Sequence, residues 1–157
     1  MSLALREAQK AAGKGEVPVG VVVVGADGKI LARAHNLRET TGDPTAHAEV
    51  LALRKSAAKQ RSWRLTGCTV YVSMEPCPMC AGALVNARVS RLVFGCADPK
   101  AGACGTLFDV PQDRRLNHRV EVTSGVMREE CSSILKAFFR KQRKKRPLVS
   151  AGRSPES

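Results

Sequence analysis

Two short segments carry the residues best suited to hold a metal ion. His47 and Glu49 are separated by a single residue near the expected start of a helix, and Cys77 and Cys80 form a Cys-x-x-Cys pair after Pro76. Imidazole and thiolate are ligands that Zn²⁺ prefers. A structural zinc site uses four protein ligands, whereas a catalytic site uses three and leaves one position to water. We therefore predict one catalytic Zn²⁺ per chain, held by His47, Cys77 and Cys80.

Glu49 follows the expected histidine ligand by two positions, a spacing that can turn its carboxylate toward a metal-bound water. There it could take a proton from the water and pass it to a substrate. Alone, an H-x-E segment is common on solvated helices, and P-C-x-x-C also occurs in structural zinc sites and redox pairs. Together the two match H-x-E…P-C-x-x-C, the signature of zinc-dependent nucleobase deaminases. The pattern predicts hydrolysis of an exocyclic amine with Glu49 as acid and base.

The cysteine pair is expected at a helix start, since Pro78 suits the first helical position, where no intrahelical partner for its missing N–H is needed. The positive end of the helix dipole should stabilise both Cys77 and Cys80 as thiolates.

The expected elements alternate between strands and helices and place both motifs at helix starts. The β-branched run Val17–Val24 predicts a strand covered on both faces, and turn residues separate it from a returning strand. Arg38–Pro44 has the composition of a polar loop. Hydrophobic periodicity predicts helices at Leu3–Ala12, Ala46–Lys59, Pro78–Asn86 and Met127–Arg140, and strands at Lys29–His35, Thr69–Met74, Arg91–Gly95 and Val120–Val122.

This order of elements predicts an α/β fold, a three-layer α/β/α sandwich with a five-stranded mixed sheet. The opening hairpin is antiparallel, and later strands return through helices, so parallel pairs should follow. We expect one zinc-dependent deaminase domain at residues 1–146 and a disordered tail at residues 147–157.

Composition limits the class of protein and the partners. The 157 residues suit one domain, and 26 Lys and Arg against 14 Asp and Glu give a net charge of +12. Such a charge favours nucleic acid as a partner, and the basic residues from Arg140 to Arg146 are candidates for phosphate contacts. No apolar run approaches the roughly 20 residues needed to cross a bilayer. The first residues lack the pattern of a signal peptide, so we expect a cytoplasmic protein without membrane contact.

The other four cysteines are expected to be buried thiols rather than disulfides or metal ligands, because a reducing cytosol disfavours disulfides. They are Cys68, Cys96, Cys104 and Cys131.

The sequence resembles the bacterial tRNA-specific adenosine deaminases of the cytidine deaminase-like superfamily. The resemblance extends from about Leu3 to Arg143 and rests on Val17–Gly20, His35–Asn36, Asp43–Glu49, Met74–Ala83, Val93–Gly95, Gly102–Asp109, Asn117–Glu121 and Phe138–Arg140. It implies conversion of the wobble adenosine of an anticodon to inosine, by attack of a zinc-bound hydroxide at C6 with release of ammonia. It also implies a homodimer that binds a tRNA anticodon stem-loop. The expected N-terminal helix is short for this family.

The resemblance assigns roles residue by residue. His47, Cys77 and Cys80 match the zinc ligands, and Glu49 matches the proton carrier. Asn36 matches the residue that hydrogen-bonds the flipped purine, with help from the backbone N–H of Ala48. The remaining matches are Val19 and Met74 in the base pocket, Asp98 and Lys100 beside neighbouring nucleotides, and Phe138 and Arg140 where the last helix meets the anticodon loop.

Two other functions stay open on the sequence. A deaminase of free guanine, cytosine or cytidine would share the zinc site but would not need a charge of +12. A zinc-stabilised nucleic-acid-binding module without chemistry would not need Glu49 and would want a fourth protein ligand.

Overall fold

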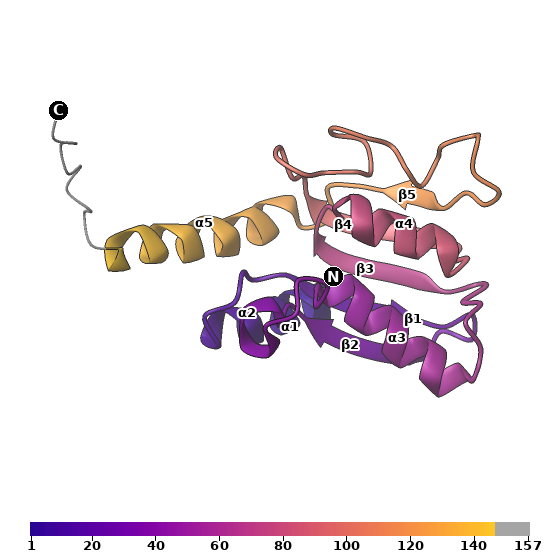
Figure 1. The fold of residues 1–157 in the computed structure, drawn as a ribbon, viewed down its shortest axis with the longest axis horizontal. Helices are drawn as coiled ribbons and strands as arrows, with labels where there is room; N and C mark the ends of the chain where they lie inside the picture. The colour runs from indigo at the N-terminus through magenta and orange to yellow at the C-terminus, as the bar shows by residue number, and fades with distance from the viewer. Residues whose placement is uncertain (147–157) are drawn as a thin grey trace, which may run out of the picture.

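A five-stranded mixed sheet in the order β2-β1-β3-β4-β5 runs through the molecule (Figure 1). The computed structural model describes residues 1–146, so the expected tail at 147–157 lies outside the described residues. The strands are β1 (Gly20–Val24), β2 (Ile30–His35), β3 (Thr69–Met74), β4 (Arg91–Cys96) and β5 (Glu121–Thr123).

The strand directions place the carboxyl ends of β3 and β4 side by side at the same end of the sheet. Strand β1 pairs antiparallel with β2 and with β3, while β3–β4 and β4–β5 are parallel pairs. The expected antiparallel hairpin and later parallel pairs are therefore confirmed. The turn between β1 and β2 uses Gly28 at φ 81°, a backbone conformation that residues with a Cβ rarely adopt.

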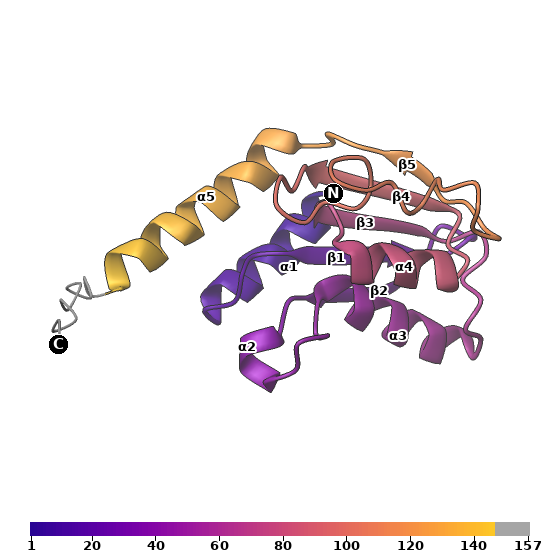
Figure 2. The ribbon, with the colours of Figure 1, turned by 45° about the horizontal axis from the view of Figure 1, so that its top comes forward.

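Helices cover both faces of the sheet, which confirms the three-layer prediction (Figure 2). Helices α3 (Ala48–Gln60) and α4 (Pro78–Asn86) lie on one face. Helices α1 (Ser2–Gly13) and α5 (Arg128–Lys145) lie on the other face, where α1 packs mainly on β1 and α5 on β4. None of the helices in the described range combines the length and apolar character that crossing a lipid bilayer requires.

The larger core lies between the sheet and α3 and α4. Alternate valines of β1 and β3 meet Leu84 and Val85 of α4 and Leu53 of α3 there. A smaller cluster on the other face joins Cys131 and Leu135 of α5 to Cys96 and their neighbours. Both buried side chains of α5 lie in its first half, and the rest of the helix extends beyond the sheet in both views (Figures 1 and 2).

Several boundaries differ from the sequence-based expectation by one to three residues; strand β1, for example, begins at Gly20 rather than at Val17. Two larger differences concern helices. The expected polar loop contains a short helix, α2 (Arg38–Thr41), because the distant Glu16 carboxylate accepts the Glu39 and Thr40 N–H groups at 2.9 and 2.7 Å. Helix α5 continues past Arg140 to Lys145, since lysine and arginine are good helix formers and suit the negative end of the helix dipole.

Candidate active site

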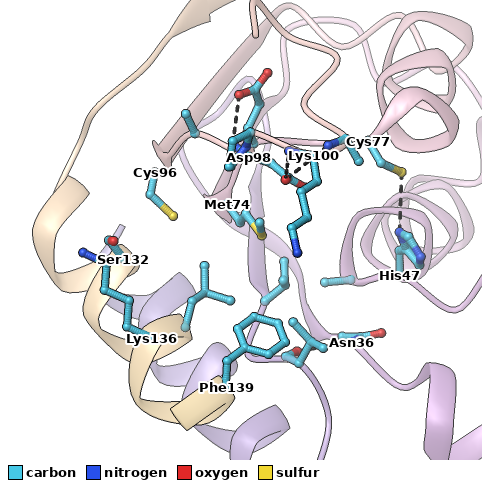
Figure 3. A pocket seen from close by; sticks show the side chains of 18 of the residues that line it. Asn36, His47, Met74, Cys77, Cys96, Asp98, Lys100, Ser132, Lys136 and Phe139 are labelled. Atoms are coloured by element: carbon cyan, nitrogen blue, oxygen red, sulfur yellow. Dashed lines mark hydrogen bonds between the residues drawn. The ribbon is translucent and has the colours of Figure 1, made fainter. Parts of the chain in front are cut away.

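The three candidate metal ligands meet at the starts of α3 and α4. His47 is the residue that precedes α3, Cys77 precedes α4, and Cys80 lies in the first turn of α4. The His47 Nδ1 atom lies 3.6 Å from Cys77 Sγ and 3.5 Å from Cys80 Sγ, and Figure 3 draws the first of these contacts. Within residues 1–146, no other group of at least three His, Cys, Asp or Glu side chains is arranged to hold a metal ion.

These distances fit a tetrahedral zinc ion. Zn–S and Zn–N bonds of about 2.3 and 2.0–2.1 Å at a tetrahedral angle separate nitrogen from sulfur by about 3.6 Å. The three ligand atoms also lie within 4.8 Å of one another. The residues present therefore suit the ion that the signature predicts, without any rearrangement of the helices.

The two thiols differ in their tendency to ionise. Hydrogen bonding with Cys80, followed by that with His47, lowers the pKa of Cys77 to about 4 against the effect of burial. The same contact, together with burial and the nearby Glu49, raises the pKa of Cys80. The pair thus shares one proton, and a bound cation would remove that proton, because a coordinating thiol is deprotonated.

Glu49 lies beside the ligand group rather than within it. Its carboxyl is buried in the first turn of α3, and Cys80 Sγ donates to its Oε2 atom at 3.2 Å. Burial raises the pKa of Glu49. A buried carboxyl next to the ligands has the location that proton transfer to or from a reacting water requires.

Asn36 presents its amide to the cavity from the end of β2. Its Nδ2 donates to the Val17 carbonyl at 3.3 Å, and its Oδ1 accepts from the Arg38 N–H at 3.2 Å. An amide offers two N–H donors and two lone pairs, so one of each stays available to a ligand. The Ala48 N–H lies at the first position of α3, where no intrahelical acceptor exists.

A cavity of about 900 Å³ brings these groups together. Of the sequence-predicted site residues, it is lined by Val19, Asn36, His47, Ala48, Glu49, Met74, Cys77, Asp98, Lys100 and Arg140. Lys100 points into this cavity toward Phe139 and Asn36 (Figure 3). Cys80 is fully buried and does not line the cavity.

Of the two α5 residues expected at the substrate site, the structure places Arg140 at the cavity but not Phe138. Phe138 is not among the lining residues, whereas its neighbour Phe139 is, with its side chain exposed. The two rings touch edge to face with centroids 5.4 Å apart. Lining residues on this helix that the sequence did not predict are Ser132, Leu135, Lys136 and Phe139, whereas Arg143 belongs to the expected basic stretch. These residues share one helix face with Arg140, but helical spacing alone does not say which face meets the cavity.

The remaining four cysteines are buried free thiols, as expected. Cys96, at the end of β4, also lines the cavity. Burial raises the pKa of the Cys96 thiol and likewise that of Cys131. Neither thiol is therefore activated as a nucleophile.

The fold and the three-ligand site with its adjacent glutamate define a nucleobase deaminase of the cytidine deaminase-like class. The family model of MafB19-like deaminases matches residues 1–143. A tRNA-specific adenosine deaminase of Bacillus subtilis (strain 168) is 54% identical over 146 residues, which are 93% of this chain and 90% of that protein. A tRNA-specific adenosine deaminase of Haemophilus influenzae is 47% identical over 151 residues, which are 96% of this chain and 87% of that protein. The chain belongs to the tRNA-specific adenosine deaminase family.

Solved structures of deaminases have a similar fold. A structure from studies of A-to-I editing by tRNA:A34 deaminases at the wobble position of transfer RNA superposes with a TM-score of 0.83 at 40% identity. The match covers 86% of this chain and 97% of that one. A guanine deaminase from Bacillus subtilis gives a TM-score of 0.60 at 28% identity, over 98% of this chain and 94% of the other.

Proposed function

We propose that this chain deaminates the wobble adenosine of a tRNA anticodon to inosine, as one deaminase domain at residues 1–146 that works in the cytoplasm. The observation that carries the proposal is the composition of the cavity. Two of the metal ligands, His47 and Cys77, and the acid Glu49 line the same cavity as several cationic side chains, among them Arg38, Lys100 and Arg143. A free base has no use for these cations, whereas an RNA loop brings phosphates to them.

His47, Cys77 and Cys80 would hold one Zn²⁺ per chain. When bound, the ion supplies Lewis-acid activation of water at neutral pH. Glu49 takes the two protons of the attacking water one after the other; it delivers the first to a ring nitrogen of the purine and the second to the amine, which leaves as ammonia. The free N–H and lone pair of Asn36 hold the purine edge, and the Ala48 N–H donates to the same base. Val19 and Met74 exclude water from the faces of the base.

Substrate affinity would come mainly from outside the base pocket. Bases of an anticodon loop are already unpaired, so turning one into the pocket costs less than in a duplex. On α5, Phe139 supplies the stacking surface first expected from Phe138, and Arg140 and Arg143 neutralise phosphates. Asp98 and Lys100 contact the neighbouring nucleotides from the opposite side of the cavity.

The deciding experiment is incubation with an anticodon stem-loop that carries adenosine at the wobble position. Mass analysis of the digested RNA should show inosine, and free adenosine should be turned over far more slowly. Absence of inosine together with turnover of free guanine, cytosine or cytidine would establish the free-base function instead. If none of these substrates released ammonia, the chain would be a nucleic-acid-binding module without catalytic activity.

The role of α5 has a matched test, because its cationic residues lie on two sides. Arg140 and Arg143 line the cavity, whereas Lys141 and Lys144 do not. The logarithm of the stem-loop binding constant should fall less steeply with the logarithm of salt concentration in the double variant R140Q/R143Q, by roughly 0.7–0.9 in slope for each lost phosphate contact. The control K141Q/K144Q removes the same number of charges and should change this slope much less. Equal slopes for the two variants would count against a specific RNA path along α5.

We also propose that the chain forms a homodimer. The tip of the hairpin closed by the Cys104–Asp109 bridge exposes Leu107 and Phe108, with 53% and 57% of their surfaces accessible. Neighbouring large apolar side chains that are exposed together are typical of protein contacts. Sedimentation equilibrium should give twice the chain mass, and the variant L107S/F108S should give the monomer. A wild-type monomer at micromolar concentration would exclude the dimer.

A further inference from the structure

One buried carboxylate, that of Glu75, connects the metal-binding turn to the loop on the opposite side of the cavity. Its Oε1 atom accepts the Asp98 N–H at 3.2 Å and the Thr106 hydroxyl. Its Oε2 atom accepts the N–H groups of Cys104 and Thr106 at 3.0 and 3.2 Å. A carboxylate has about four lone-pair sites, so these donors use all of them and leave none for a substrate.

The loop held in this way carries residues that line the cavity. Asp98 is tied to Glu75 through its N–H, and its own Oδ1 accepts the Lys100 and Ala101 N–H groups at 2.9 and 3.2 Å. A chain of hydrogen bonds thus runs from Glu75 through Asp98 to Lys100. On the other side, Glu75 is followed by Pro76, whose carbonyl accepts the Ala103 N–H at 2.9 Å, and then by the ligand Cys77.

Gly102 shows how closely the loop approaches this carboxylate. A Cβ atom built on Gly102 would lie 2.5 Å from the Glu75 carboxyl and 2.5 Å from the Asp98 carbonyl. A Cβ atom is essentially never found that close to a non-bonded heavy atom, so a side chain at position 102 would displace the loop or the Glu75 carboxylate. Glycine at position 102 therefore lets the loop pack directly against the Glu75 carboxylate.

We propose that Glu75 is a positioning residue, which fixes the distance between the loop residues Asp98–Ala101 and the reaction centre and thereby sets the affinity for the nucleotides that flank the target base. This inference rests on the proposed function. Glu75 is among the residues that line the cavity, but its carboxylate oxygens are occupied by the four donors of the loop, so in this role it acts on the substrate through the loop. Its loss should therefore raise KM for the RNA while leaving the metal and the chemical step largely unchanged.

The principal variants are Glu75→Gln and Gly102→Ala. In Glu75→Gln, the side-chain amide keeps only one oxygen with two lone pairs, and its NH₂ group is itself a donor. Two of the four loop donors would therefore lose their acceptor and face an N–H group instead. Gly102→Ala displaces the same loop without changing any charge or acceptor. Because displacements of about 1 Å can cost up to 100-fold, both variants should raise KM for the stem-loop about tenfold or more. The turnover number should stay within about threefold, with one zinc per chain.

Thr106 offers a finer pair of variants, since it contributes one side-chain donor. Thr106→Val removes that hydroxyl and should raise KM less than the principal variants do. Thr106→Ser keeps the hydroxyl and should retain the wild-type KM. This pair and Gly102→Ala decide the question even if Glu75→Gln fails to fold.

Amide hydrogen exchange supplies a measurement that needs no turnover. In Gly102→Ala and Glu75→Gln, exchange should accelerate at Asp98, Cys104 and Thr106 but not along α4. An unchanged KM in both variants, or unchanged exchange in the loop, would overturn the proposal. So would loss of zinc together with a fall in kcat, which would indicate a merely structural role. A wild-type protein that converts no stem-loop would count against the proposed function alone, and exchange would then decide whether Glu75 fixes the loop.

Discussion

Asn36→Ala separates substrate recognition from folding, because the structure divides the bonds of this amide into two sets. One N–H and one lone pair serve Val17 and Arg38, and one of each stays free for the purine. Two hydrogen bonds to the base at about 0.5–1.5 kcal/mol each are worth about 1–3 kcal/mol. At 1.36 kcal/mol per tenfold, kcat/KM for the stem-loop should fall by roughly 5- to 160-fold.

The cost in stability should be smaller than the cost in activity. The Val17 carbonyl keeps a second donor, the Val19 N–H at 2.9 Å, and the exposed Arg38 can bond to water. The variant should therefore lose about 1 kcal/mol of unfolding free energy. For a chain of this size, that lowers the melting temperature by about 2–4 °C.

The assay is single-turnover deamination of the stem-loop at several RNA concentrations, with zinc content and thermal unfolding measured on the same samples. Asn117→Ala is the matched control, because Asn117 is exposed and does not line the cavity. A kcat/KM for Asn36→Ala within about twofold of the wild-type value would refute recognition by this amide. A fall in activity that follows loss of zinc would refute it equally.

Further predictions concern the proton carrier, the metal, a buried carboxylate and two glycines. Glu49→Gln should keep zinc and stem-loop binding but lower kcat about 10²–10⁴-fold, since the amide cannot carry the proton; kcat within about tenfold of wild type would show another route. Cys80→Ser removes one ligand of the three, so elemental analysis should find well under one zinc per chain, and full zinc with full activity would contradict the assignment. Burial alone would raise the pKa of Glu16, but hydrogen bonds from Thr40 and Glu39 outweigh it and hold the pKa below its ordinary value. Glu16→Gln should therefore lower the free energy of unfolding in urea by about 1.5–3 kcal/mol at pH 7. The stabilisation by the Glu16 carboxylate is complete above its unfolded pKa of about 4.3 and is lost as the pH falls through the folded pKa. The difference in unfolding free energy between wild type and variant should therefore narrow below about pH 4, and a constant difference would contradict this role. Gly20→Ala places a Cβ 2.0 Å from the Ala4 carbonyl and should lower the melting temperature by several degrees, whereas Gly82→Ala, with no atom within 4 Å on α4, should raise it slightly.

The ligand group was predictable because its two parts together form a specific motif. The spacing of Cys77 and Cys80 at the start of α4 is local, whereas His47 before α3 lies 30 residues from Cys77, so its place beside the cysteines was predicted from the combined signature. The β-branched runs predicted the strands locally. The cavity-facing side of α5 was not predictable. Adjacent helix positions point about 100° apart, so only the docking of Cys131 and Leu135 on the sheet selects Phe139 over Phe138.

Long-range hydrogen bonds were equally invisible in the sequence. Helix α2 depends on Glu16, which lies more than 20 residues earlier in the chain. The residues near Arg38 contain no capping pattern that would predict this helix. Glu75 stands next to the cysteine motif and looks like part of it. Its partners at Asp98, Cys104 and Thr106 are 23, 29 and 31 residues away, so only the folded chain reveals what it holds.

The outer half of α5 has a consequence for how such an enzyme can diversify. Its side chains beyond Leu135 are partly or fully exposed, and substitutions at surface positions usually change stability by less than about 0.5 kcal/mol. The catalytic groups, in contrast, sit in the first turns of α3 and α4, which are anchored in the larger core. Selection in nature or in the laboratory can therefore vary the RNA that is bound along α5 almost independently of folding and of the reaction itself.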